Sequence, residues 1–113
     1  MRQRLAALVV VGLLVAGCSG GGGADGQPVA TDRVELPKSY RFDPADIRID
    51  VGTTVTWTNN DDFPHNVHLL DESDRTVDLP IGGEGTLTFD EQGTTDYECS
   101  LHPQQMRGTV TVA

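Results

Sequence analysis

The chain has 113 residues, of which 17 are acidic and 8 are basic, so its formal net charge at pH 7 is −9. This length allows one small domain with a modest core and excludes a second catalytic domain. The acidic balance disfavours binding to nucleic acid or to an anionic lipid surface, and it favours a basic protein partner or a salty medium. The charge also serves solubility, which is the simpler explanation.

The N-terminal residues have the pattern of a secretion signal. A basic start is followed by an apolar run from Leu5 to Ala16, which is too short to span a bilayer. The ending Val15-Ala16-Gly17-Cys18 resembles the lipobox of bacterial and archaeal lipoproteins, in which the cysteine is lipidated and becomes the first mature residue. We therefore expect a lipoprotein signal peptide at residues 1–17. The alternative is an ordinary signal peptide with a coincidental cysteine.

Residues 18–31 are predicted to form a flexible tether, because a serine and four glycines follow Cys18 and the segment offers little to bury. The folded domain is expected at residues 32–113, at the outer face of the cell membrane or in the periplasm. Cleavage before Cys18 would remove two arginines and no acidic residue, and would change the formal charge from −9 to −11. With Cys18 lipidated, Cys99 remains as a single exported thiol, which is either a liability or a ligand.

Beyond the tether, apolar residues recur with period two, which is typical of half-buried strands. Turn signals separate these segments, including Asn59-Asn60-Asp61-Asp62 and Gly82-Gly83. The pattern predicts about seven short strands, the number expected of a β-sandwich. Residues 70–80 are acidic and weakly patterned, and the sequence leaves their structure open. The alternation is clearest at residues 47–51, 55–58, 86–90, 96–99 and 109–112.

A thiol, an imidazole and a thioether lie close together near the C-terminus, at Cys99, His102 and Met106. They lie between two predicted strands, so they can meet only if the connection folds back as a loop. An imidazole from His65 would complete a set of two nitrogens and one sulfur with a weak axial methionine. This is the ligand set of blue-copper electron-transfer sites, and its soft sulfurs suit Cu(I) as well as Cu(II).

Strand phase distinguishes His65 from His68. On an extended segment the two side chains point to opposite faces, whereas on a helix they would share one face, as in a catalytic zinc motif. Pro64 and the Asn/Asp cluster before it argue against a helix. We therefore predict His65 as the ligand and assign His68 to the surface or to packing.

The order His, Cys-x-x-His, Met, with Pro-His-Asn and a Gly-Thr-Val-Thr-Val ending, resembles the plastocyanin/amicyanin/halocyanin branch of the cupredoxins from residue 34 onward. The resemblance implies an all-β Greek-key β-sandwich that binds one copper ion. It also implies hydrogen bonds from Asn66 and Ser100 that join the two ligand-bearing loops. Partners in this family dock on apolar residues around the second histidine. The corresponding patch here consists of Pro64, Leu101 and Pro103.

The axial position has alternatives. The methionine follows the second histidine by three residues in amicyanin-like loops and by five in plastocyanin-like loops, whereas Met106 follows His102 by four. A glutamine or a backbone oxygen can also occupy this position, so Gln104 and Gln105 are candidates. Met106 could instead fill the core beside the last strand.

The resemblance implies a monomeric one-electron carrier and not an enzyme, working with redox proteins such as a basic cytochrome or a terminal oxidase. Three other functions remain open on the sequence. One is copper delivery or storage without electron transfer. Another is a zinc hydrolase with two histidines and one cysteine, although the motif has no evident general base. The last is a metal-free adhesive sandwich, in which the motif would be a coincidence.

Overall fold

The computed structural model describes residues 27–113. The predicted signal peptide, Cys18 and most of the predicted tether fall within residues 1–26 and lie outside the described part of the chain. Within residues 27–113, no helix is long and apolar enough to cross a membrane.

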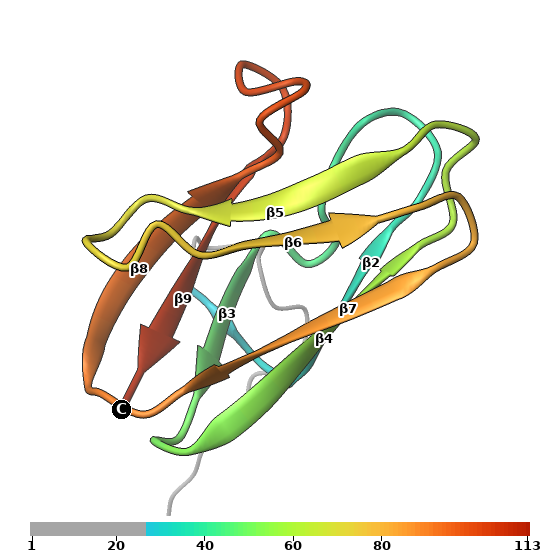
Figure 1. Ribbon diagram of the computed structural model, residues 1–113. Helices are drawn as coiled ribbons and strands as arrows, with labels where there is room; N and C mark the ends of the chain where they lie inside the picture. Colours follow the sequence, from blue (N-terminus) through green and yellow to red (C-terminus); the bar gives the residue numbers. More distant parts are fainter. Residues whose placement is uncertain (1–26) are drawn as a thin grey trace, which may run out of the picture.

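The described chain is a sandwich of two β-sheets (Figure 1). The larger sheet has the strand order β1-β3-β9-β8-β5-β6, and the smaller sheet has the order β2-β4-β7. The predicted all-β sandwich is therefore confirmed. The strands are β1 Val29–Ala30, β2 Arg33–Leu36, β3 Asp46–Ile49, β4 Thr53–Asn59, β5 His65–Leu69, β6 Thr76–Leu79, β7 Glu84–Phe89, β8 Gly93–Glu98 and β9 Arg107–Val112.

Two of these strands were not expected. Strand β1 pairs in parallel with β3 through Val29 and Ile47, inside the segment that we expected to be tether. Strand β6 lies in the weakly patterned acidic segment and pairs with β5, with Leu79 opposite His65. Residues 37–45 form turns and bends, apart from one isolated bridge between Glu35 and Asp43.

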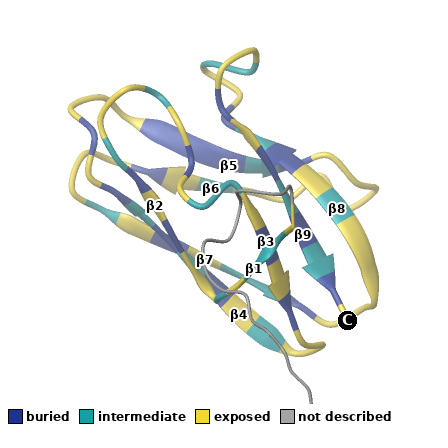
Figure 2. Ribbon diagram, turned by 180° about the vertical axis from the view of Figure 1, so that it is seen from behind, coloured by how far each residue is buried: buried dark blue, intermediate teal, exposed yellow. Residues whose placement is uncertain are grey.

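The core lies between the two sheets, where the inward face of nearly every strand is buried (Figure 2). The alternating pattern of the sequence is reproduced in β2 and β3, in which every second residue is buried. Burial of this apolar surface is the main stabilising contribution to the fold. The buried apolar residues are Val34, Leu36, Phe42, Ile47, Ile49, Val55, Trp57, Val67, Leu69, Leu79, Phe89, Tyr97, Cys99, Met106, Val110 and Val112.

One glycine is required where β8 and β9 meet next to the ligand loop. Gly108 lies opposite Tyr97 in the register of the two strands. A Cβ atom at Gly108 would lie 2.6 Å from the Tyr97 ring and 2.1 Å from the carbonyl oxygen of Ala45. The Tyr97 hydroxyl also donates a hydrogen bond to that carbonyl, at 2.8 Å. The absence of a side chain at Gly108 therefore lets a buried tyrosine fix the base of the loop that carries the candidate ligands.

Candidate metal centre

The connection between β8 and β9, residues 99–106, projects from one end of the sandwich (Figure 1). Its first turn closes through the His102 amide, which donates to the Cys99 carbonyl at 3.0 Å. The amides of Gln105 and Met106 then donate to the His102 carbonyl at 3.1 and 3.0 Å, and the Cys99 amide donates to the Met106 carbonyl at 3.1 Å. The connection therefore folds back on itself, as convergence of its side chains requires.

Three of the predicted ligand atoms meet at this end. The Cys99 Sγ lies 3.7 Å from Nδ1 of His65 and 3.9 Å from Nδ1 of His102. All three atoms lie within 4.8 Å of one another. Cys99 is fully buried and His65 is 2% exposed, whereas His102 is half-buried. The site is thus enclosed by protein except on the side of His102.

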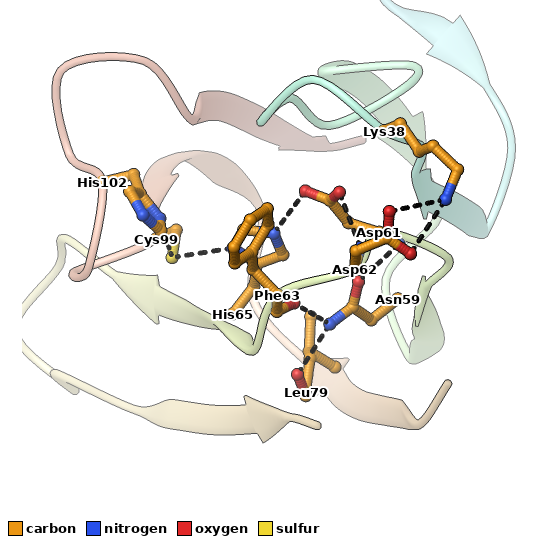
Figure 3. A network of polar contacts seen from close by, with 9 residues as sticks. All are labelled: Lys38, Asn59, Asp61, Asp62, Phe63, His65, Leu79, Cys99 and His102. Atoms are coloured by element: carbon orange, nitrogen blue, oxygen red, sulfur yellow. Dashed lines mark hydrogen bonds and ion pairs between the residues drawn. The ribbon is translucent and has the colours of Figure 1, made fainter. Parts of the chain in front are cut away.

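Asp61 sets the orientation of the His65 ring from the side of the ring that faces away from Cys99. The Nε2 of His65 lies 2.8 Å from Oδ2 of Asp61, and both side chains are buried (Figure 3). An ionised carboxylate only accepts hydrogen bonds, so Nε2 carries the proton and donates it. The lone pair of the neutral ring then lies on Nδ1, which faces Cys99. This is the tautomer that a metal bound among these atoms requires.

The Asp61 carboxylate is held ionised by its surroundings. Burial by itself raises the pKa of Asp61, but hydrogen bonds from the His65 ring and from the amides of Asp62 and Tyr40 outweigh it and bring the pKa below its usual range. The loop is in turn fixed by Asn59, whose amide nitrogen donates to the carbonyls of Phe63 and Leu79, both at 2.9 Å. A negative charge is therefore fixed directly behind one imidazole.

Asn66 and Ser100 join the two segments that bear the ligands. The Asn66 side chain donates to the Ser100 hydroxyl at 2.8 Å and accepts a hydrogen bond from the Ser100 amide at 2.8 Å. Each residue directly follows a candidate ligand in the sequence. The hydrogen bonds implied by the family resemblance are thus present, and bonds of this kind orient metal ligands.

The structure separates the candidates for the axial position by burial. Met106 is fully buried, whereas Gln104 and Gln105 are exposed. The backbone of Met106 is bonded to both Cys99 and His102, so its side chain begins beside the other ligands. These contacts support Met106 over either glutamine.

His68 lies on the opposite face of β5 from His65, as the strand phase predicted. It is partly exposed, and its Nε2 lies 2.5 Å from Oδ1 of Asp74. Its Nδ1 lies 3.8 Å from Oε2 of Glu98 on the neighbouring strand. The side chain is therefore an element of the surface charge network and is not part of the cluster formed by the three candidate ligands.

The three residues predicted to form a docking patch are neighbours of the candidate ligands in the sequence. Leu101 is 56% exposed, Pro64 is exposed, and Pro103 is half-buried. Leu101 and Pro103 flank the half-buried His102, and Pro64 precedes His65. An apolar surface therefore adjoins the least enclosed candidate ligand.

Sequence reasoning missed two residues that contact the candidate ligands. One is Asp61, which the sequence placed in an ordinary polar turn. The other is Tyr40, whose ring centroid lies 4.7 Å from that of His102 and 5.9 Å from that of His65. The spacing of Asp61 four residues before His65 is a weak signal, and the sequence around Tyr40 offers none.

Nitrogen and sulfur ligands lie about 2.0–2.3 Å from a first-row metal ion such as zinc, and an ion at such distances fits among atoms spaced as these are. Two imidazoles and a thiolate, with a methionine nearby, are the donors of a type 1 copper centre. The fold and the donor set thus define the class of blue copper proteins.

Comparison with known proteins gives the same class. Residues 33–113 match the family of copper binding proteins described as the plastocyanin/azurin family. The chain is 34% identical to amicyanin-alpha of Methylorubrum extorquens over 90 residues, which cover 75% of this chain and 74% of that protein. The chain belongs to the plastocyanin/azurin family, and its cofactor is copper.

Two further relatives match over a smaller part of their own length, and one solved structure matches over its whole chain. The chain is 39% identical to amicyanin of Paracoccus denitrificans, covering 70% of this chain and 63% of that one. It is 44% identical to halocyanin of Natronomonas pharaonis, covering 65% of this chain and 48% of that one. Its fold is similar to a purple cupredoxin of Nitrosopumilus maritimus, with a TM-score of 0.63 and 32% identity over 74% of this chain and 100% of that one.

Proposed function

We propose that this chain is an exported, membrane-tethered blue copper protein that carries single electrons between redox proteins. His65, Cys99, His102 and Met106 would hold the ion. The observation that carries the proposal is the convergence of Sγ and two Nδ1 atoms within 4.8 Å at one end of a cupredoxin fold. A copper ion bound there would supply one-electron chemistry by alternating between Cu(I) and Cu(II).

The surroundings of these residues suit electron transfer because they limit rearrangement. His65 is held by Asp61 at 2.8 Å, and the two ligand segments are joined by the paired bonds of Asn66 and Ser100. A donor set that moves little between oxidation states needs little reorganisation when an electron arrives or leaves. Electron transfer is therefore favoured by the rigidity of the sandwich end.

Copper delivery or storage is the second candidate. A protein that passes its ion to another protein needs accessible ligand atoms. Here Cys99 is fully buried and His65 is 2% exposed. The enclosure of these two residues therefore favours a resident ion over a transferred one.

The proposed docking surface is the apolar patch of Pro64, Leu101 and Pro103 beside His102. Close approach to His102 would shorten the path of the electron, while long-range attraction between the acidic domain and a basic partner would govern encounter. A basic cytochrome or a terminal oxidase has the required chemistry. Raising the salt concentration should slow the exchange of electrons with such a partner.

The experiment that tests the function is an absorption spectrum of the copper-loaded, oxidised protein, parent and Cys99→Ser. The parent should be intensely coloured through sulfur-to-copper charge transfer, since Cys99 is the one free cysteine of the described chain. Cys99→Ser should remain folded and lose the colour. If the parent is colourless, a zinc site or a metal-free sandwich remains as the explanation. A blue Cys99→Ser protein would refute the ligand assignment.

A further inference from the structure

Tyr40 covers the candidate metal centre from a loop that supplies none of its ligands. Its ring centroid lies 4.7 Å from that of His102, in a tilted arrangement, and 5.9 Å from that of His65, edge to face. It also stacks on Phe63, with a centroid distance of 5.4 Å and an interplanar angle of 23°. Contacts of this kind between aromatic rings are favourable and depend on orientation.

The backbone of this loop is held in an unfavourable conformation to place that ring. Ser39 has φ of 94° and Tyr40 has φ of 57°, in the left-handed region that residues with a side chain rarely adopt. Conformations of this kind persist where the surrounding structure enforces them, and they cluster at functional sites. The local sequence alone would therefore not favour this backbone conformation at Tyr40.

Two interactions with the segment before His65 lie next to this part of the loop. The Tyr40 amide lies beside the Asp61 carboxylate, which bonds His65, and contributes to lowering the pKa of Asp61. Next to it, Lys38 forms an ion pair with Asp62 at 2.8 Å (Figure 3). The loop that carries Tyr40 therefore packs against the segment that leads into His65.

We propose that Tyr40 is a positioning residue of the copper centre, which packs against His102 and keeps water away from the least enclosed ligand. The inference rests on the proposed function. His102 is the only half-buried member of the three converging ligands, and Tyr40 makes the closest ring contact that it has in the described chain. Removing the Tyr40 ring would free the imidazole and admit solvent.

The consequence for the potential has a definite sign. One thiolate and two neutral imidazoles leave the site neutral with Cu(I) and with one positive charge with Cu(II). A water-poor surrounding disfavours the charged form. The Tyr40 ring therefore favours the reduced protein, and its loss should favour the oxidised protein.

The test compares Tyr40→Leu with Tyr40→Phe, which keeps the ring. In the metal-free protein, the chemical shifts of the His102 ring protons report the ring contact directly. We expect Tyr40→Leu to change these shifts and Tyr40→Phe to retain them. In the copper-loaded protein, Tyr40→Leu should shift the redox equilibrium with a fixed mediator toward the oxidised protein by about threefold to tenfold. A tenfold shift corresponds to about 59 mV for one electron. Tyr40→Phe should stay near the parent.

Phe63→Leu is the matched control, because it removes the other stacking partner of Tyr40 and leaves the ring on His102. It should change neither readout. The inference is overturned if Tyr40→Leu matches the parent, if Tyr40→Phe behaves like Tyr40→Leu, or if Phe63→Leu has the same effect. If Tyr40→Leu does not fold, Tyr40→Met is judged by the same criteria. A parent that binds no copper would refute the proposed function, while the metal-free measurement would still decide the contact between Tyr40 and His102.

Discussion

The carboxylate of Asp61 should lower the reduction potential of the centre, and Asp61→Asn tests this. The substitution keeps the shape of the side chain and an oxygen that can accept the His65 proton, but it removes the charge. The pKa of Asp61 is held below its usual range, chiefly by the His65 hydrogen bond acting against burial, so the charge is present at neutral pH. A fixed negative charge near the ion stabilises Cu(II) over Cu(I). Its removal should therefore raise the potential.

The magnitude follows from the distance. Oδ2 of Asp61 lies 2.8 Å from Nε2 of His65, and the width of the imidazole ring and a metal bond add about 4 Å. Unit charges about 7 Å apart interact by about 2.4 kcal/mol at an effective dielectric constant of about 20. Since a tenfold change in a one-electron equilibrium is about 1.4 kcal/mol or 59 mV, we expect an increase on the order of 100 mV.

Asp62→Asn is the control for this measurement. Asp62 is the next residue in the sequence, but its side chain is 68% exposed and paired with Lys38. The effect of an exposed, paired charge is weakened by solvent, so the potential should change much less. Redox titration of both variants, with absorption spectra to show that the site is intact, decides the matter. An unchanged or lower potential in Asp61→Asn, or an equal increase in Asp62→Asn, would refute the reasoning.

Three further predictions concern the surface and the anchor. The Asp74 hydrogen bond raises the pKa of His68 against the effect of partial desolvation. The folded protein therefore holds the His68 proton more tightly than the unfolded chain does. The protonated His68 contributes fully to stability below about pH 6.5, and this contribution is lost as the pH rises through the folded-state pKa. His68→Gln should remove that part of the pH dependence from urea unfolding of the copper-loaded protein, and an identical pH profile would contradict this. Leu101→Asp should slow electron self-exchange on the order of tenfold, measured by NMR, because like charges meet across the patch; an unchanged rate with an unchanged spectrum would exclude this exit route. Cys18→Ala should release the protein from membranes with the visible spectrum unaltered, and unchanged membrane association in fractionation would count against lipidation.

The ligands could be predicted from the sequence because their chemistry is demanding. Few residue types bind copper, and Cys99, His102 and Met106 lie within eight residues. The choice of His65 over His68 followed from the two-residue period of a strand, which the buried Val67 and Leu69 reproduce. Strand β6 escaped prediction because it is short, follows an acidic stretch and has one fully buried residue.

The roles of the residues around the ligands could not be predicted from the sequence, for a different reason. Asp61 and Asp62 are identical and adjacent, yet one is buried against His65 and the other is exposed beside Lys38. Their roles are set by where the loop is anchored, which depends on contacts far away in the sequence. Tyr40 adopts a backbone conformation against its local preference, so no pattern of propensities indicates it.

Asp61 and Tyr40 should change the reduction potential of the same centre in opposite directions. The charge of Asp61 favours the oxidised protein, whereas the apolar cover of Tyr40 favours the reduced one. They are not independent, because the Tyr40 amide lies beside the Asp61 carboxylate that bonds His65 and contributes to lowering its pKa. Residues that are in contact show non-additive effects when they are changed together. The reduction potential therefore depends on both residues together. A substitution that frees the loop would change the position of the Asp61 charge and of the Tyr40 ring at the same time.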